Sequence, residues 1–461
     1  MSLDVLIIGA GMSGLAAGIR AAYYNKKVCI LEKHSKIGGL NSFYTKNGYK
    51  FDVGLHALTN YVPKSTKNTP FPKLLRQLRL KYEDFSLSEQ IISSIKFPRK
   101  TLYFTNEREF LFDSINDNFP AQKDNFQRLL RYISEFDELD LHSSFMSART
   151  IVASFISDPL LVDMLFCPLM FYGCSGEHDM DFSQFAVMFK SIFCEGFARP
   201  AGGVRPLLSL LLKKYVRLGG TLHTRSAVKK ILVNNDAVRS VLLENGEEIR
   251  AKRILSSIGY FETGALCSPQ KKSFAPHEDR VGKLSFVELI VLLNRSMNEQ
   301  GFTQSICFFS QNNRFHYKRP DDFVDTSSGV ICCPNNFNYK SPLKDNILRV
   351  TCLANFSLWN NLREEDYQRQ KERAREMILR KVITLIPDFR DSIVFSDIFT
   401  PRTVYNFTGH INGAVYGTPY KKRDGLTPFR NLYICGTDQG FLGIIGALLS
   451  GISMANLYLL K

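Results

Sequence analysis

The stretch DVLIIGAGMSGLAAGIRAAYYNKKVCILE, residues 4–32, decides the fold of this 461-residue chain. It opens with a short apolar run at 4–8, which is typical of a buried parallel strand. A glycine-rich turn follows, then a helix is predicted over 15–25 and a second strand over 28–31. This order predicts a βαβ unit, with its turn at the end of the first strand.

The three glycines of the turn have the G-x-G-x-x-G spacing of dinucleotide-binding folds. Gly9 permits the tight turn, Gly11 lets the backbone approach a pyrophosphate, and Gly14 lets helix and strand pack closely. The helix N-terminus presents free N–H groups and a positive dipole end to phosphates, so Met12 and Ser13 are predicted cofactor contacts.

The second strand ends at Glu32, about 20 residues after the first glycine, with Lys33 beside it. A carboxylate there accepts ribose hydroxyls and repels a 2′-phosphate. The paired Gly38 and Gly39, followed by Leu40, allow a second close backbone approach to an extended cofactor. The chain has a single G-x-G-x-x-G, whereas a built-in NAD(P)H domain would normally need its own. We therefore predict FAD, with electrons entering or leaving by another route.

The C-terminal sequence supplies a second half for this site. Residues 431–435 predict a buried strand, and the apolar residues from 443 onward predict a final helix. Its N-terminus can face a flavin ring or a phosphate, because small residues let the backbone lie against the ring. The predicted contacts here are Gly436, Gly443, Ile444 and Ile445.

The rest of the chain predicts an α/β fold in two domains. A nucleotide-binding domain is assembled from 1–65, 196–270 and 401–461. A substrate and membrane-facing domain of α+β type is inserted as 66–195, which is mostly helical and aromatic-rich, and 271–400.

These motifs resemble the phytoene-desaturase-like FAD oxidoreductases, especially their carotenoid isomerase and retinol saturase branch. The resemblance rests on GAGMSG (9–14) with Glu32, GGLNSFYTKNGYKFDVG (38–54), NGAVYGTP (412–419) and NLYICGTDQGFLGIIGALLSG (431–451). It implies a Rossmann-like FAD-binding domain of the glutathione-reductase and amine-oxidase type, with an inserted substrate domain.

The resemblance also implies roles for single residues. Asp438 would contact the ribityl or pyrophosphate part of FAD, and Val228 would pair its backbone with the adenine. One position departs from the pattern: many relatives carry Arg or another polar residue where this chain has Leu40. The local flavin contacts at Leu40 therefore stay open.

Members of the group saturate, desaturate or isomerise C–C double bonds of long, apolar polyenes. The resemblance thus implies an FAD-dependent oxidoreductase acting on an apolar polyene or isoprenoid lipid, and the 12% aromatic content fits such a substrate. Two alternatives stay open: an FAD-dependent amine or protoporphyrinogen-type oxidase, and a non-catalytic prenyl-lipid escort protein on the same fold. The intact glycines and Glu32 weigh against the escort protein.

A flavin carries hydride chemistry itself, so a catalytic side chain is not required. His56 follows 52–54, where the chain should pass the flavin, and is our candidate to donate a proton or orient substrate; a structural histidine is the alternative. Glu288 interrupts an apolar strand, either as a buried carboxylate with a raised pKa or, as we favour, as the polar face of an edge strand. The phenylalanines of 182–197 mark one helical face, predicted to be core. No metal site is predicted.

Lys and Arg outnumber Asp and Glu by 59 to 44, a net charge of +15. This excess fits a merely soluble basic surface or peripheral adsorption to an anionic membrane. No nucleic-acid-binding motif is present, so no nucleic-acid partner is expected. The ten cysteines are scattered without CxxC pairs, and neither a signal peptide nor a membrane span is apparent. We expect a cytoplasmic protein, at most peripheral to the cytoplasmic membrane face; the oligomeric state stays open.

Overall fold

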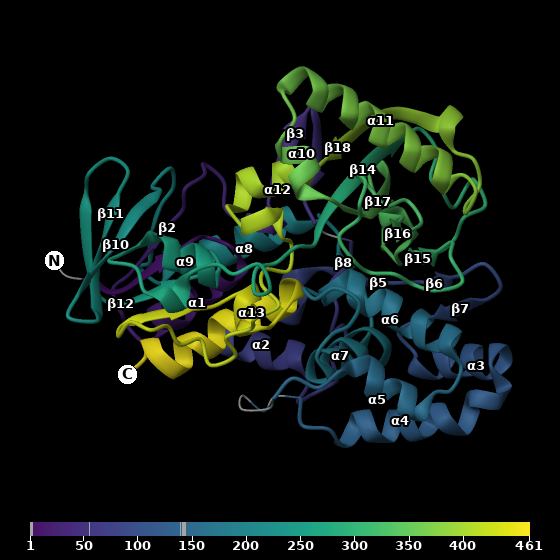
Figure 1. The fold of residues 1–461 in the computed structure, drawn as a ribbon, viewed down its shortest axis with the longest axis horizontal. Helices are drawn as coiled ribbons and strands as arrows, with labels where there is room; N and C mark the ends of the chain where they lie inside the picture. The colour runs from purple at the N-terminus through teal and green to yellow at the C-terminus, as the bar shows by residue number, and fades with distance from the viewer. Residues whose placement is uncertain (1–2, 55, 139, 141–143) are drawn as a thin grey trace.

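The structure is a computed structural model that describes residues 3–54, 56–138, 140 and 144–461. Two sheets organise it, one on each side of the molecule in Figure 1, with helices covering their faces. Both termini lie near the first sheet (Figure 1).

The first sheet is built around the strand predicted at the N-terminus. Its order is β13-β10-β11-β12-β1-β2-β9, and β19 also pairs with β12. Pairings β12–β1, β1–β2, β2–β9 and β12–β19 are parallel, whereas β10, β11 and β12 form an antiparallel meander. The strands are β1 (Leu3–Ile8), β2 (Val28–Leu31), β9 (Thr221–His223), β10 (Val228–Asn234), β11 (Ala237–Leu243), β12 (Glu248–Ser256), β13 (Cys267–Ser268) and β19 (Leu432–Ile434).

Both faces of β1 and β2 are buried, which explains their unbroken apolar sequence. Val5 and Ile7 point into one core, and Leu6 and Ile8 into another on the opposite face. The first core also takes residues from α1, α2, α8 and α13, and the second takes residues from α9. These helices are α1 (Met12–Tyr23), α2 (Pro70–Leu78), α8 (Val204–Arg217), α9 (Tyr260–Leu266) and α13 (Gly443–Met454).

The second sheet has the order β18-β14-β17-β16-β15-β6-β7 and is antiparallel except between β6 and β15. Its strands are β6 (Ser93–Lys96), β7 (Thr101–Phe104), β14 (Ser285–Leu293), β15 (Ile306–Ser310), β16 (Ser328–Cys332), β17 (Asn346–Ala354) and β18 (Ile393–Phe399).

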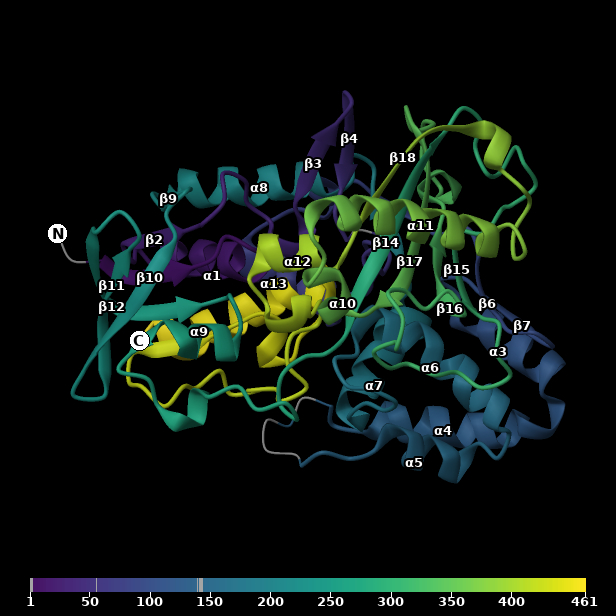
Figure 2. The same cartoon turned by 45° about the horizontal axis from the view of Figure 1, so that its top comes forward.

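Helices cover both faces of this sheet. The long α11 (Glu364–Val382) packs on one face through Ala374, Ile378 and Val382. A helical layer covers the other face, as Figure 2 shows. Its members are α3 (Arg108–Asn118), α4 (Lys123–Glu135), α5 (Ala148–Phe155), α6 (Pro159–Gly173) and α7 (Phe182–Phe189).

Smaller elements lie between the sheets. The hairpin of β3 (Phe43–Lys46) and β4 (Tyr49–Asp52) and the helices α10 (Phe356–Asn360) and α12 (Pro401–Thr408) lie beside β18 and β14 (Figures 1 and 2). The pair β5 (Leu87–Glu89) and β8 (Ala198–Pro200) joins residues more than a hundred positions apart. No helix among the described residues combines the length and apolarity needed to cross a membrane.

Two features differ from the sequence-based expectation for 66–195. Helix α2 packs against α1 and α13 in the core of the first sheet, so 70–78 lie with the nucleotide-binding half. Strands β6 and β7 join the second sheet, although the segment was expected to be mostly helical. Strand β7 pairs locally with β6, whereas β15, the other partner of β6, lies some 200 positions later, so no local pattern marks the entry of this hairpin into the sheet. The phenylalanines of 182–197 are core, as predicted.

Candidate functional site

Four parallel strands of the first sheet end together at one edge. The register pairs Ile8 with both Leu31 and Ser256, and Ser256 with Ile434. The residues that follow these strand ends are therefore neighbours at the carboxyl edge, where open α/β sheets bind ligands. They are Gly9, Glu32, Ser257 and Cys435.

The turn after β1 uses its three glycines in different ways. Gly9 has a φ of +97°, and a Cβ there would lie 2.5 Å from Ser257 Oγ. A Cβ on Gly14 would lie 2.1 Å from the Gly9 carbonyl oxygen, so glycine is what lets α1 pack this closely on the turn. A Cβ on Gly11 would meet nothing within 4 Å. Two glycines therefore serve packing, and the third leaves open space beside the backbone.

The first turn of α1 offers donors that no side chain caps. Its N-cap residue, Gly11, makes no side-chain cap hydrogen bond, and Met12 and Ser13 follow with their backbone N–H groups in the first turn. The helix dipole adds positive partial charge at the same place. This end of α1 therefore suits an anion such as a pyrophosphate.

Glu32 stands at the end of β2, as predicted. Its Oε2 accepts a hydrogen bond from the Ala10 N–H and its Oε1 from the His34 N–H, both at 2.9 Å. Each oxygen keeps a second lone-pair site for a ribose hydroxyl. Lys33 extends toward α12, where its Nζ donates to the Asn406 carbonyl at 3.5 Å, and burial lowers its pKa.

The paired glycines lie against the turn after β1. The Gly38 N–H donates to the Ala10 carbonyl at 2.9 Å, and a Cβ on Gly39 would lie 3.7 Å from Gly11 Cα. Both glycines have positive φ, +114° and +57°, and the half-buried Leu40 follows. A second backbone segment thus reaches the place that Gly11 leaves open.

The C-terminal segment also contacts the first turn of α1. A Cβ on Gly436 would lie 3.1 Å from Ser13 Oγ, and a Cβ on Gly451 would lie 2.0 Å from the Ser13 carbonyl oxygen, so α13 packs directly on α1. Gly443 has a φ of +72° and meets nothing within 4 Å, and α13 has no side-chain cap. The N-terminus of α13 lies eight residues before Gly451, so it is about 12 Å along the helix from the point where α13 packs on the first turn of α1. The two uncapped helix N-termini are therefore separate, and an extended cofactor is needed to contact both.

The side chains of Ile444 and Ile445 are buried in the core of the first sheet. Only their backbone can therefore face a cofactor. Val228 begins β10, where it pairs with Leu243; its predicted contact with the adenine stays a prediction.

Asp438 lies in the turn that follows β19. It is 1% exposed, and its oxygens accept from the N–H groups of Tyr260 at 2.7 Å and Thr418 at 2.9 Å. Burial, together with Glu262 nearby, raises its pKa. The carboxylate thus fixes the turn after β19, and its contact with the ribityl or pyrophosphate group stays a prediction.

Lys421, which was not predicted from the sequence, holds this turn through two hydrogen bonds. Its Nζ donates to the carbonyls of Tyr416 at 2.7 Å and Thr437 at 3.0 Å. Burial lowers its pKa to about 8. Both acceptors are backbone carbonyl oxygens, which every residue has, so no sequence motif predicts this contact.

The residues present fit FAD. The open positions at Gly11 and Gly443 are places where only a side chain would obstruct a cofactor, and each adjoins an uncapped helix N-terminus. Glu32 lies at the ribose position of the fold. Gly11, Met12, Ser13, Gly38 and Gly39 would hold the pyrophosphate, and Gly443 the flavin end.

His56 lies between the two sheets, in a buried polar group. Its Nε2 is 3.0 Å from Thr351 Oγ1 and 3.6 Å from Glu288 Oε1, and its carbonyl accepts from Arg199 Nη1 at 2.8 Å. Burial lowers the pKa of the imidazole, which is therefore neutral at pH 7. The described contacts show a well-fixed neutral histidine.

Our interpretation of Glu288 was wrong. Strand β14 is not an edge strand, because β17 and β18 flank it, and Glu288 is 3% exposed. Although burial raises its pKa, the Arg349 guanidinium and His56 outweigh that effect and hold the pKa of Glu288 below its ordinary value. Arg349, 2% exposed, donates to Glu288 Oε1 through Nε. The carboxylate is thus ionised and paired.

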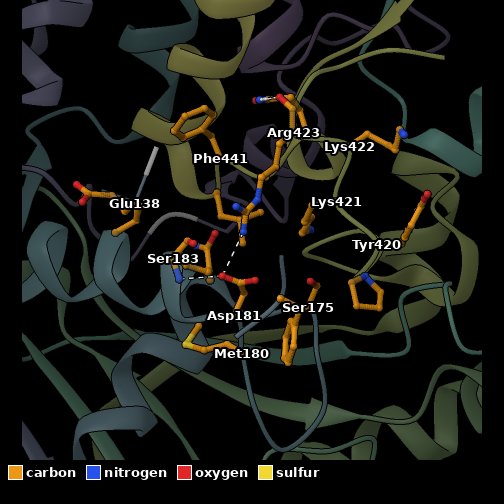
Figure 3. Close-up of a pocket in the computed structure, with 18 of the residues that line it drawn as sticks. Glu138, Ser175, Met180, Asp181, Ser183, Tyr420, Lys421, Lys422, Arg423 and Phe441 are labelled. Carbon is orange, nitrogen blue, oxygen red and sulfur yellow. Dashed lines mark hydrogen bonds and ion pairs between the residues drawn. The ribbon is translucent and has the colours of Figure 1, made fainter. Parts of the chain in front are cut away.

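A cavity of about 610 Å³ opens beside the turn before α13. Figure 3 shows Phe441 of that turn and the segment Tyr420 to Arg423 facing Ser175, Met180 and Asp181 of the helical layer. Arg423 pairs with Asp181 at 3.2 Å across it. The cavity therefore joins the C-terminal half of the cofactor site to the substrate-side domain. Among the described residues, no three His, Cys, Asp or Glu side chains are grouped to hold a metal ion.

Comparison with known proteins agrees with this geometry. Residues 12–458 match the family described as flavin-containing amine oxidoreductase. The chain is 24% identical to a chloroplastic prolycopene isomerase of Daucus carota, over 98% of this chain and 79% of that one. It is 22% identical to an all-trans-retinol 13,14-reductase of Danio rerio, over 99% and 86%. An oxidoreductase from Methanosarcina mazei has the same fold, with a TM-score of 0.68 at 15% identity over 98% of this chain and all of that one.

The family match confirms the fold, the FAD cofactor and the class of FAD-dependent oxidoreductase expected from the sequence, and the relatives confirm the resemblance to the carotenoid isomerase and retinol saturase branch. The match spans nearly the whole chain, from the first turn of α1 through the C-terminal half of the FAD site. This chain belongs to the flavin-containing amine oxidoreductase family.

Proposed function

We propose that this protein is an FAD-dependent oxidoreductase that saturates, desaturates or isomerises C–C double bonds of an apolar polyene or isoprenoid lipid. The observation that carries the proposal is the cavity of about 610 Å³, which adjoins the N-terminal turn of α13 and has Met180, Phe441 and Leu442 in its lining. The names of two relatives, an isomerase of prolycopene and a reductase of retinol, support the same substrate class.

When bound, FAD supplies the hydride chemistry. The chain's own residues would hold the cofactor at Gly11 and Gly443. The cavity beside α13 would enclose the reacting region with a mixed lining, in which Met180 and Leu442 are buried and apolar and Asp181, Lys421 and Arg423 carry charge.

We propose that His56 faces the substrate side of the flavin. Because its pKa is lowered, the neutral imidazole can accept a proton or a hydrogen bond there, while Thr351 and Glu288 orient the ring.

We also propose that the protein works in the cytoplasm and adsorbs to an anionic membrane surface, where it takes up its apolar substrate. The net charge of +15 supports the adsorption, and the ten unpaired cysteines support a reducing compartment.

Purification tests the flavin part of the proposal. We expect a yellow protein that releases FAD on denaturation and carries polyene or isoprenoid lipids that mass spectrometry identifies. A colourless preparation that takes up no added FAD would favour the lipid-escort alternative.

Anaerobic spectroscopy tests the substrate part. For a desaturase, a polyene lipid should bleach the oxidised flavin; for a saturase, it should reoxidise the chemically reduced flavin; for an isomerase, chromatography should show a changed double-bond isomer ratio. If an amine or a porphyrinogen alone bleaches the flavin, the oxidase alternative is correct.

Ser175→Trp, which narrows the cavity, should slow the lipid reaction at least tenfold at unchanged FAD content. Ser154→Trp, on exposed α5, is the matched control and should leave the rate unchanged.

A further inference from the structure

A second cavity, of about 240 Å³, lies outside the chemistry described so far. It is enclosed by the β3–β4 hairpin, the end of β18 and helix α12, which lie together in Figures 1 and 2. At one point it adjoins Gly39 and Leu40 of the cofactor segment. A ligand here would therefore lie next to the predicted FAD site, and the remaining lining, mostly from β3, β18, α11 and α12, contains no residue assigned to FAD.

Most of its lining is apolar. The apolar side chains are Leu40, Phe43, Val53, Ile398, Phe399, Val404 and Phe407. Such walls suit a hydrocarbon group. The volume equals that of about eight water molecules at roughly 30 Å³ each, which limits the occupant to a short chain.

The other part of the lining is charged, and its positive side chains outnumber its carboxylates. Asp397, 9% exposed, receives a hydrogen bond from Tyr44 at 2.9 Å and an ion pair from Lys46 at 2.6 Å. Lys371 Nζ is 3.9 Å from the same carboxylate, and its side chain is 17% exposed. Among the described residues, Asp397 is the one carboxylate within 4 Å of that ammonium.

Two ammonium groups thus share one carboxylate at the polar end of an apolar cavity. Lys46 is 46% exposed and solvated, so the largely buried charge is that of Lys371, whose Nζ also lies 5.8 Å from the centre of the Tyr367 ring. The next charges outward, Glu364 and Arg402, pair with each other at 3.5 Å and largely offset one another. A buried charge without a full partner costs free energy, and an anionic ligand would remove that cost. Burial lowers the pKa of Lys371, in keeping with this incomplete compensation.

We propose that this cavity binds a small monocarboxylate with an apolar tail of about six carbons, consistent with its volume. The carboxylate group lies between Lys46 and Lys371, and the tail lies among Phe43, Phe399 and Val404. The site is separate from the cavity at Ser175 and Phe441, so the proposal holds whichever lipid the flavin reaction uses.

Calorimetric titration of the FAD-loaded protein with three matched ligands tests this site. Hexanoate should bind at least tenfold more tightly than hexan-1-ol, because the tails match and only the anion is attracted. Hexylamine, a cation of the same length, should not bind. Equal affinity for hexanoate and hexan-1-ol would overturn the proposal.

Variants locate the effect. Lys371→Met should abolish the tenfold preference for hexanoate while hexan-1-ol still binds, which shows that the cavity is intact. Val404→Trp should fill the cavity and abolish binding of both ligands. Arg373→Met, on the exposed side of the same helix, is the control and should change nothing. An unchanged preference in Lys371→Met, or release of FAD by hexanoate, would contradict a separate anion site. The flavin reaction is measured separately with the lipid substrate, so failure of this proposal is distinguishable from failure of the proposed function.

Discussion

Gly11 and Gly14 are three positions apart on the same turn, yet a methyl group at each would meet different surroundings. At Gly11 it would enter the open space assigned to the pyrophosphate, and at Gly14 it would collide with the Gly9 carbonyl. One glycine is therefore kept for the ligand and the other for packing.

This difference predicts opposite outcomes for two alanine variants. Gly11→Ala should change the free energy of unfolding of the apoprotein by no more than about 0.5 kcal/mol but weaken FAD binding at least tenfold. Gly14→Ala should destabilise the apoprotein by about 1–3 kcal/mol, because packing must shift. Denaturant unfolding and flavin fluorescence titration measure the two effects. Equal loss of stability in both variants would contradict the assignment of Gly11 to the ligand.

Lys421 predicts a pH dependence of stability. Its pKa is about 8 in the folded protein and returns to its ordinary value near 10.4 on unfolding. Between these values the unfolded chain binds more protons at this site, so the free energy of unfolding should rise with pH. The contribution is up to about 1.4 kcal/mol per pH unit.

The measurement compares the wild type with Lys421→Met by urea unfolding at pH 7.5, 8.5 and 9.5. The difference in unfolding free energy between the two should grow in favour of the wild type across this window. A difference that stays constant with pH would show that the folded-state pKa of Lys421 is not lowered.

At the scale of elements, the pair Glu288 and Arg349 joins β14 to β17. The register places Glu288 opposite Thr351 and Arg349 opposite Ile290, so the charged side chains are diagonal neighbours on one face of the sheet. They lie in strands whose other residues are almost all apolar. An ion pair here fixes the register of the two strands. If one strand shifted by one residue, its charged side chain would move to the other face of the sheet and both charges would be buried without a partner.

Replacing one residue of this ion pair should lower the free energy of unfolding more than replacing both residues. Glu288→Gln leaves the buried guanidinium unpaired and should lower the free energy of unfolding by about 3 kcal/mol. The double variant Glu288→Leu with Arg349→Met should recover most of that loss, since apolar side chains replace both charges. Urea unfolding of the single and double variants gives the coupling energy. Additive losses would mean that the two side chains do not stabilise one another.

At the scale of the whole molecule, the positive net charge predicts how the proposed binding to membranes depends on lipid charge and salt. With a net charge of +15, the proposed adsorption should depend on electrostatics. The protein should sediment with vesicles that contain an anionic phospholipid and not with purely zwitterionic ones. Raising the salt from 0.05 to about 0.5 M should release it, because the Debye length falls to a few ångströms. Equal binding to both vesicle types would contradict the electrostatic proposal.

The sequence by itself determined the nucleotide-binding unit. Its strand, glycines, helix and Glu32 lie within 32 residues, where local spacing dictates geometry, and the complementary turn at 436–443 is equally local. The tertiary structure alone decided which distant groups meet: Glu288 with His56 and Arg349, Asp438 with Tyr260 and Thr418, and Lys371 with Asp397. These contacts follow from strand register and from packing between segments that are up to 232 positions apart, the separation of His56 and Glu288. No periodic pattern in the sequence predicts these contacts, because they depend on how the two sheets and their helices are arranged in space.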